Sequence, residues 1–370
     1  MEILILNWKD IKNPTAGGAE IIAFFLARRL VKDGHRVVFF SQMFKNALAQ
    51  ETIDGVKIVR KGNNFNVYLE AYLYYKKLQK KPDKVLDMIN TICWQTPLYV
   101  PREKRVAFVN QLAKEVWFYQ KPYPLSLIGY ILERFEYFSY KNTKFICYSK
   151  STKEDLIAFG IKKENIDLFS LGVDHARYKK GNKKAQHPLF VFIARLVKMK
   201  RADICIRAMV SILKDYPNAE LAIIGNGQDE KRLVALANAL GISRNITFVN
   251  KNNFFIDKNQ ADTKVTFMQK AWALLLPSVK EGWGMVVTES AACGTPAIVS
   301  NVTGLKDSVR DNKTGIILSA NPTPGELSNA MLIFIKDKNL RGKLQKNAFA
   351  WSKKFSWDIS YGLFKKLLFT

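Results

Sequence analysis

Short apolar runs alternate along the whole chain with longer segments of helical periodicity. The run at 2–7 is apolar almost throughout, which is typical of a strand buried on both faces of a parallel sheet. A glycine-containing loop follows, and apolar residues then recur at helical spacing over 19–32. A second apolar run begins at 36–40. This order of strand, loop, helix and strand is the unit of a doubly wound sheet.

The same order recurs in two parts of the chain. In the N-terminal part the pattern predicts further strands at 56–59, 84–89, 106–109 and 144–148, and a helix at 150–159. In the C-terminal part it predicts strands at 189–194, 220–224, 246–249, 271–277 and 296–299. The helices predicted there are 201–216, 229–240, 284–293, 324–337, 339–351 and 359–368.

The polar and poorly periodic stretch 174–188 separates the two parts and is predicted to be a linker. We therefore expect an α/β protein with two Rossmann-like doubly wound domains, at 1–173 and 189–352, that face a central cleft. Residues 353–370 follow the second domain and contain an amphipathic helix. Ligands of such folds bind at the carboxyl ends of the parallel strands, so we expect the residues of a functional site in the loops that follow the strands.

The loop after the predicted strand 271–277 carries the strongest candidate site. Glu281 and Glu289 bracket the start of a helix, with Gly282 and Gly284 between them. The glycines let the backbone approach a ligand closely, and the N–H groups at the start of a helix suit a phosphate. Two carboxylates so placed can hold sugar hydroxyls at different distances from that phosphate. The alternative is an ordinary strand-to-helix turn with a capping acid.

A second candidate site is the pair Arg195 and Lys200, which follows the first strand of the C-terminal part. Two cations at the carboxyl end of a strand, facing a helix N-terminus across a cleft, would neutralise a diphosphate leaving group. A solvated basic loop is the alternative. Two weaker signals are the glycine pair at 17–18 and the Gly-Asn-Gly at 225–227, which lacks the third glycine of a dinucleotide fingerprint.

Together these residues resemble the large family of retaining glycosyltransferases called family four, or glycosyl transferases group 1, with the two-domain B-type fold. The matching segments extend over nearly the whole chain: 17–20, 148–152, 172–174, 195–200, 225–227, 277–289, 294–296 and the final stretch with Trp357. The resemblance implies that the C-terminal helix returns to the first domain. It also implies a hexosyl transfer that uses a nucleotide-sugar co-substrate, with no metal and no other cofactor.

The resemblance further implies a role for each matching position. Of the catalytic residues, Glu281 would bind the hydroxyls of the donor sugar, and Arg195 and Lys200 would hold the diphosphate. Glu289 would bind the ribose of the nucleotide. The remaining donor-binding positions are Gly17, Gly18, Gly225, Gly282, Trp283, Gly284, Met285 and Val286.

The chain departs from the family pattern at a few positions. Asn110 stands where relatives often have a histidine that contacts donor or acceptor, so we take Asn110 as the acceptor-side candidate. Ala194 and Arg201 stand where the family has glycines.

Net charge adds a constraint on partners. The chain has 58 Lys and Arg against 32 Asp and Glu, a formal charge of +26, and the excess is spread over both halves. This balance favours anionic partners, namely phosphates, an anionic lipid surface or nucleic acid. A lysine-rich surface without a specific partner is the alternative. The four cysteines are far apart in sequence, which favours reduced thiols and a cytoplasmic protein.

An aromatic stretch at 117–132 lies near basic clusters at 76–84 and 102–105. Such a combination suits a membrane interface, whereas core helices with wet basic faces are the alternative. No apolar run approaches the ~18 residues of a spanning helix, and the N-terminus is predicted to be a strand and not a signal peptide. We therefore expect a cytoplasmic protein that docks peripherally on the inner face of the cell membrane, with a hydroxyl acceptor that is lipid-linked or a cell-surface glycan.

Three other classes of protein are alternatives. A sugar-nucleotide epimerase of the same fold would need acid and base groups for which the chain offers no candidate set. A basic nucleic-acid-binding protein is favoured by charge alone, and no helix-turn-helix, RRM or zinc pattern is present, so no specific nucleic acid is expected. An NAD-dependent dehydrogenase is weakened by the incomplete glycine fingerprint. The donor base, the sugar and the acceptor stay open.

Overall fold

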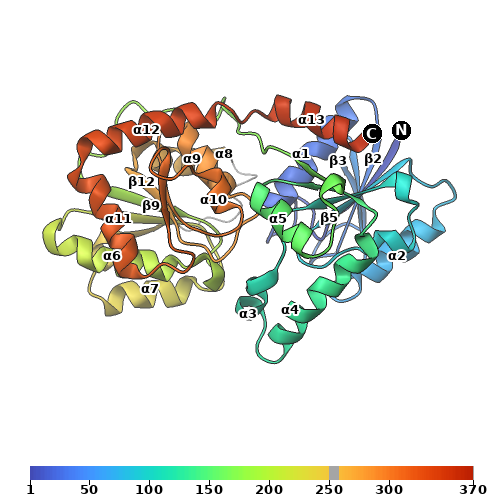
Figure 1. Cartoon of the computed structure of the whole chain (residues 1–370), viewed down its shortest axis with the longest axis horizontal. Coiled ribbons are helices and arrows are strands. Elements are labelled where there is room, and N and C mark those ends of the chain that lie inside the picture. The colour runs from blue at the N-terminus through green and yellow to red at the C-terminus, as the bar shows by residue number, and fades with distance from the viewer. Residues whose placement is uncertain (250–257, 370) are drawn as a thin grey trace. The chain divides into compact units, whose positions relative to one another are not determined.

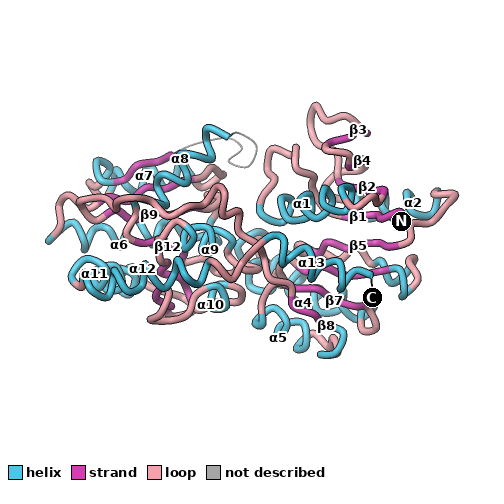
Figure 2. Tube along the Cα trace, turned by 90° about the horizontal axis from the view of Figure 1, so that it is seen from above, coloured by secondary structure: helices cyan, strands magenta, loops and turns pink. Residues whose placement is uncertain are grey.

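The computed structural model describes residues 1–249 and 258–369. The chain divides into two compact α/β units, the first made of Met1–Phe169 and Tyr361–Thr370 and the second of Ser170–Ser360 (Figure 1). Figure 2 shows the strands of each unit lying together, with helices around them. The prediction of two α/β domains with parallel sheets is confirmed.

The sheet of the first unit has its strands in the order β3-β4-β2-β1-β5-β6-β7-β8, and all neighbours are parallel except β3 and β4. The strands are β1 (Glu2–Leu6), β2 (Arg36–Ser41), β3 (Gln50–Ile53), β4 (Val56–Arg60), β5 (Lys84–Ile89), β6 (Arg105–Val109), β7 (Lys144–Cys147) and β8 (Ile166–Leu168). Central β1 pairs with β2 on one side and β5 on the other, with Ile5 opposite Phe39 and Leu86. The strand order reverses between β1 and β5, so the loops at their carboxyl ends diverge and leave room for a site.

The helices of the first unit are α1 (Gly18–Lys32), α2 (Val67–Lys77), α3 (Trp117–Gln120), α4 (Leu125–Glu136), α5 (Lys150–Ala158) and the second half of α13 (Trp357–Phe369). Tyr361 and Lys365 of α13 both donate to the carboxylate of Asp33, at 2.9 and 2.8 Å, and these bonds lower the pKa of Asp33. Phe364 packs on Phe108 and Phe169 in the core. The expected return of the C-terminal helix to the first domain is therefore confirmed.

The sheet of the second unit is parallel throughout, in the order β11-β10-β9-β12-β13-β14. Its strands are β9 (Leu189–Ile193), β10 (Glu220–Ile224), β11 (Ile246–Val249), β12 (Ala273–Leu276), β13 (Ala297–Ser300) and β14 (Gly315–Leu318). Its helices are α6 (Ala202–Asp215), α7 (Glu230–Ala239), α8 (Lys258–Lys270), α9 (Met285–Ala292), α10 (Leu305–Ser308), α11 (Pro324–Lys336) and α12 (Lys338–Ser352). Here the strand order reverses between β9 and β12.

The stretch 174–188, which we expected to be a linker, lies within the second unit. The N–H of Ala185 donates to the carbonyl of Lys270 at 2.9 Å, and the indole of Trp272 donates to the carbonyl of Ala185 at 2.9 Å. His175 lies 3.0 Å from the carbonyl of Phe355. Hydrogen bonds to the second unit hold most of the segment, and Tyr178 is its buried aromatic residue. The boundary between the units accordingly falls earlier, after Phe169.

Candidate active site

The candidate residues of the second unit lie in loops at one edge of its sheet. Arg195 follows β9, Gly225 follows β10 and Glu281 follows β12. Because these strands are parallel, their carboxyl ends meet at the same edge, and β9 and β12 flank the point where the strand order reverses. The fold therefore brings together the basic loop and the two-carboxylate loop that the sequence pointed to.

Lys200 and Glu281 are joined directly. Lys200 ends a short 3-10 turn and is buried, and its Nζ lies 2.5 Å from Oε1 of Glu281. The hydroxyl of Ser278 donates to the same oxygen at 3.1 Å. The backbone also ties the two loops, since the N–H of Val279 donates to the carbonyl of Met199 at 2.9 Å. Arg195 lies exposed in the same basic loop.

Gly225 supports the loop that carries Arg195. A Cβ on Gly225 would lie 1.9 Å from the carbonyl oxygen of Ala194, and one on Gly227 would lie 2.2 Å from that of Leu196. The N–H of Leu196 donates to the carbonyl of Asn226 at 2.7 Å. Only glycines let these two backbones approach so closely. The close contact of Gly225 is with the loop that carries Arg195, and its donor-binding role stays a prediction.

The start of α9 has the geometry of an anion site. Gly284 is the N-cap, with a φ of 84° in the left-handed region, and a Cβ there would meet Leu305 at 2.7 Å. The first N–H groups of a helix have no partner within the helix, and those of Met285 and Val286 stand in this first turn. Gly282 packs against Gly304, where a Cβ would lie 2.7 Å from the Gly282 carbonyl.

Trp283 was also expected to bind the donor, but its indole packs inside the unit. The side chain is buried and meets the ring of Phe355 edge to face at 5.4 Å. The indole thus supports the loop from within the second unit.

Glu289, in the second turn of α9, is held by a lysine that the sequence did not single out. Nζ of Lys264, on α8, lies 2.5 Å from Oε2 of Glu289 and 3.2 Å from the hydroxyl of Tyr178. All three side chains are buried. Burial disfavours the charge of Lys264, but the Glu289 and Tyr178 oxygens outweigh it and raise the pKa of Lys264. Burial and the Glu289 charge raise the pKa of Tyr178 to about 12.

The remaining candidates, Gly17, Gly18 and Asn110, belong to the first unit. Gly17 is the N-cap of α1, and its N–H donates to Oε2 of Glu20 at 2.6 Å, which is half of a capping box. Gly18 is the first residue of α1. The Gly-Gly-Ala-Glu pattern therefore builds a helix start whose glycine backbone is partly accessible.

Asn110 follows β6 at the carboxyl edge of the first sheet, but its side chain is buried. Its Nδ2 donates to the carbonyl of Ile89 at 3.4 Å, and its Oδ1 accepts a hydrogen bond from the hydroxyl of Tyr148. Burial, with the charge of Glu20, raises the pKa of Tyr148 well above its usual value, so this hydroxyl stays protonated and can donate. The amide that we expected on the acceptor side is thus engaged by its own sheet.

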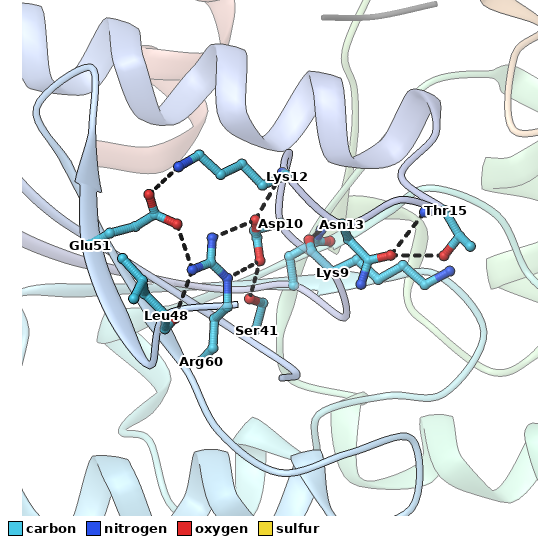
Figure 3. Close-up of polar contacts among 10 residues, drawn as sticks. Lys9, Asp10, Lys12, Asn13, Thr15, Ser41, Leu48, Glu51 and Arg60 are labelled. Carbon is cyan, nitrogen blue, oxygen red and sulfur yellow. Dashed lines mark hydrogen bonds and ion pairs between the residues drawn. The ribbon is translucent and has the colours of Figure 1, made fainter. Parts of the chain in front are cut away.

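A buried ion-pair network fixes the loop between β1 and α1 (Figure 3). Nε and Nη2 of Arg60 hold the two oxygens of Asp10, at 2.6 and 2.9 Å, and both side chains are 0% exposed. Ser41 donates to Asp10 at 3.0 Å, and Arg60 also donates to Glu51 at 2.7 Å. Lys12 pairs with Glu51. The loop that leads to the Gly17 N-cap is thereby tied to the ends of β2 and β4.

Two family models match the chain. Residues 175–351 match the model "Glycosyl transferases group 1", and residues 16–177 match the model "Glycosyltransferase Family 4". Between them they cover most of the two units. The chain therefore belongs to the glycosyltransferases that these models define, and the resemblance seen in the sequence is confirmed.

Individual relatives are more distant. The chain is 27% identical over 215 residues to the D-inositol 3-phosphate glycosyltransferase of Nocardia farcinica, a match covering 54% of this chain and 46% of that protein. The matched region thus spans about half the length of that relative.

Solved structures share the fold over the full chain. Sucrose-phosphate synthase from Thermosynechococcus elongatus has a TM-score of 0.79 at 19% identity, covering 99% of this chain and 98% of that one. Anabaena HepE in complex with UDP-glucose has a TM-score of 0.73 at 17% identity, covering 100% and 99%.

We predict that replacing Arg60, which is buried, destabilises the protein far more than replacing Arg28, which is exposed. Arg60→Met leaves Asp10 buried without its cation, and we expect the free energy of unfolding of the first unit to fall by about 3–5 kcal/mol in urea. Arg28→Met is the control: its bond to Asp54, at 3.0 Å, joins exposed side chains and contributes less than about 1 kcal/mol. Equal losses in the two variants would show that the buried network does not fix this unit.

Proposed function

We propose that the chain transfers a hexose from a nucleotide-diphosphate sugar to a hydroxyl acceptor, with retention of configuration at the sugar. The observation that carries the proposal is the pair of anchored carboxylates on either side of the start of α9. Glu281 is held by Lys200 and Ser278, and Glu289 is held by Lys264. Between them, the first turn of α9 offers N–H groups to a diphosphate. The bound UDP-glucose in HepE, a protein of the same fold, supports a donor of this class.

The roles follow from charge and position. Glu281 accepts hydrogen bonds from donor-sugar hydroxyls, and Glu289 accepts from the ribose. Arg195 and Lys200 stabilise the charge that builds on the diphosphate as it leaves. The bond between the anomeric carbon and the phosphate oxygen breaks, and the acceptor oxygen bonds to the same face of that carbon. The acceptor proton passes to the departing phosphate oxygen, so charge and atoms balance without a protein base.

We further propose that these two cations take the place that a divalent metal has in other sugar-nucleotide enzymes. Arg195 is exposed to reach a phosphate, and the Lys200 ammonium has three N–H donors, so it can bind a phosphate while it stays bonded to Glu281. Turnover should therefore persist after treatment with EDTA. Loss of activity that a divalent ion restores would overturn this part of the proposal.

The carboxylate roles predict a specific loss of catalysis. Glu281→Gln and Glu289→Gln each weaken a charged hydrogen bond to the donor, worth about 1.5–3 kcal/mol, which corresponds to a fall of about 10-fold to 150-fold in kcat/KM. The measurement is sugar transfer or donor hydrolysis with UDP-, GDP- and ADP-sugars.

Asp215→Asn, an exposed carboxylate at the end of α6, is the matched control and should keep full activity. Full activity in both glutamate variants, on a donor that the unaltered chain uses, would contradict the assignment of the donor site.

We also propose that the first unit docks on an anionic bilayer and that the acceptor is lipid-linked. The argument begins at α4, a helix whose polar side faces inward. Only Ser126 and Glu133 of α4 are buried, and Glu133 accepts from the N–H groups of Ala113 and Lys114, both at 2.6 Å. Polar side chains and hydrogen bonds, and not apolar packing, therefore attach α4 to the rest of the first unit.

The outward side of α4 is apolar. Its exposed apolar residues, with those of the adjoining segments, are Phe118, Tyr119, Tyr123, Leu125, Leu127, Ile128, Tyr130, Ile131, Leu132, Phe135 and Phe138. Figure 1 shows α3 and α4 projecting from the sheet of the first unit. A group of exposed apolar side chains on one helix and its neighbours is typical of an interaction surface, and we call this group the apolar patch. Among the described residues, no helix has the length and apolar character to cross a bilayer.

Charge supports a bilayer as the occupant of this patch. Lys121, Arg134 and Lys141 are exposed around it, and Nζ of Lys141 lies 3.7 Å above the ring of Phe138. The chain as a whole carries +26. Basic side chains beside an apolar face suit anionic headgroups above an acyl layer, at ~1 kcal/mol for each basic residue.

Vesicle binding tests this surface. Exchanging Ile128 and Ile131, which are 48% and 49% exposed, for Glu places charge where the acyl layer would be. We expect the unaltered chain to sediment with phosphatidylglycerol-containing vesicles, and Ile128→Glu/Ile131→Glu to stay in solution. The control is Ile333→Glu on α11, a residue 42% exposed in the second unit, which should bind as before.

Two outcomes would reject the membrane proposal. One is an unaltered chain that ignores anionic vesicles at low salt. The other is a double variant that binds them unchanged. A chain that ignores vesicles but forms a dimer, which the double variant abolishes, would assign the patch to a second copy of the protein.

A further inference from the structure

Lys264 is a buried lysine with a defined partner on the next helix. It lies on α8, and its ammonium contacts Oε2 of Glu289 on α9 and the hydroxyl of Tyr178. Its side chain is 7% exposed and that of Glu289 is 10% exposed. Lysine is seldom buried unless it is paired, and the pairing here joins three segments that are distant in sequence.

The contact constrains which carboxylate oxygen of Glu289 remains for a ligand. Oε2 is 2.5 Å from the lysine, a short charge-assisted bond that holds this oxygen in place and restricts the rotation of the carboxylate. The Tyr178 hydroxyl, 3.2 Å from the same ammonium, fixes the lysine from its other side. A carboxylate fixed in this way loses little freedom when a hydroxyl binds to it, which is the energetic benefit of preorganisation.

We propose that Lys264 is a positioning residue for the ribose of the donor nucleotide. It holds Glu289 so that Oε1 receives a ribose hydroxyl while Oε2 stays with the lysine. The inference rests on the proposed function, because it takes Glu289 as the ribose contact. Tyr178 completes the arrangement by holding the lysine, and neither Lys264 nor Tyr178 touches the sugar that is transferred.

A thermodynamic cycle between the protein and the ribose tests this role. The probes are UDP and 2′,3′-dideoxy-UDP, with the GDP and ADP pairs used if UDP does not bind, and the measurement is calorimetric affinity. In the unaltered chain, we expect the dideoxy nucleotide to bind about 10-fold to 100-fold more weakly. In Lys264→Met, UDP should weaken by a similar factor, while the dideoxy nucleotide should keep the affinity that it has for the unaltered chain.

Two further variants keep the test sharp. Lys270→Met, on the same helix but exposed, should change neither affinity. Lys264→Gln retains a donor for Glu289 and should give an intermediate loss with UDP. Lys264→Met leaves a buried carboxylate without its cation. If that variant does not fold, Lys264→Gln is measured in its place.

The outcomes separate this inference from the proposed function. Equal weakening of both nucleotides in the Lys264 variants, or no weakening of either, overturns the positioning role. An unaltered chain that binds none of the nucleoside diphosphates would contradict the proposed function itself.

Discussion

The bond between Lys200 and Glu281 is the contact on which the candidate site depends. It joins the loop after β9 to the loop after β12, the two strands at which the order of the second sheet reverses. Parallel strands place both loops at one edge, but only the ion pair fixes the carboxylate and the cation at a defined separation. The Val279–Met199 backbone bond sets the register of the same two loops. Because removing one partner of a buried ion pair destabilises a protein strongly, the pair holds these two loops together, and we propose that a diphosphate meets them in this form.

The first unit uses the same physical device for another purpose. Its buried pair, Arg60 with Asp10, ties the loop after β1 to the ends of β2 and β4 and so fixes the approach to the Gly17 N-cap. The Arg60 and Asp10 side chains at the centre of that network are 0% exposed, whereas Arg195 is exposed. The first network therefore shapes a loop, whereas the second offers charge to a ligand. This division agrees with a donor site in the second unit and an apolar docking surface on α4 of the first.

The sequence predicted the strands well where both faces of the sheet are buried. Central strands such as β5 (Lys84–Ile89) and β10 (Glu220–Ile224) were predicted to the residue, because continuous apolar runs mark them. The missed strands β3, β8 and β14 all lie at sheet edges. β3 and β8 carry no continuous apolar run, and β14, although apolar, is only four residues long and half-buried at its centre. Of the site, Lys200 and Glu281 were predicted together. Lys264 and Tyr178 were not, because their partnership with Glu289 arises from packing between α8, α9 and a segment expected to be a linker. The exposure of the apolar side of α4 could not be predicted either. The spacing of apolar residues shows that a helix has an apolar face, but it does not show whether that face points to the core or to solvent.

Amide hydrogen exchange of the intact chain, with and without a saturating nucleoside diphosphate, tests the central claim most directly. The ligand should slow exchange in the first turn of α9 and in the loop at 195–200, because those backbone groups become bonded or covered. The rest of the second sheet should change little. Protection at 281–289 and 195–200 is the result predicted by a donor site at the carboxyl edge of the second sheet. A nucleotide that binds and protects neither segment would contradict that site.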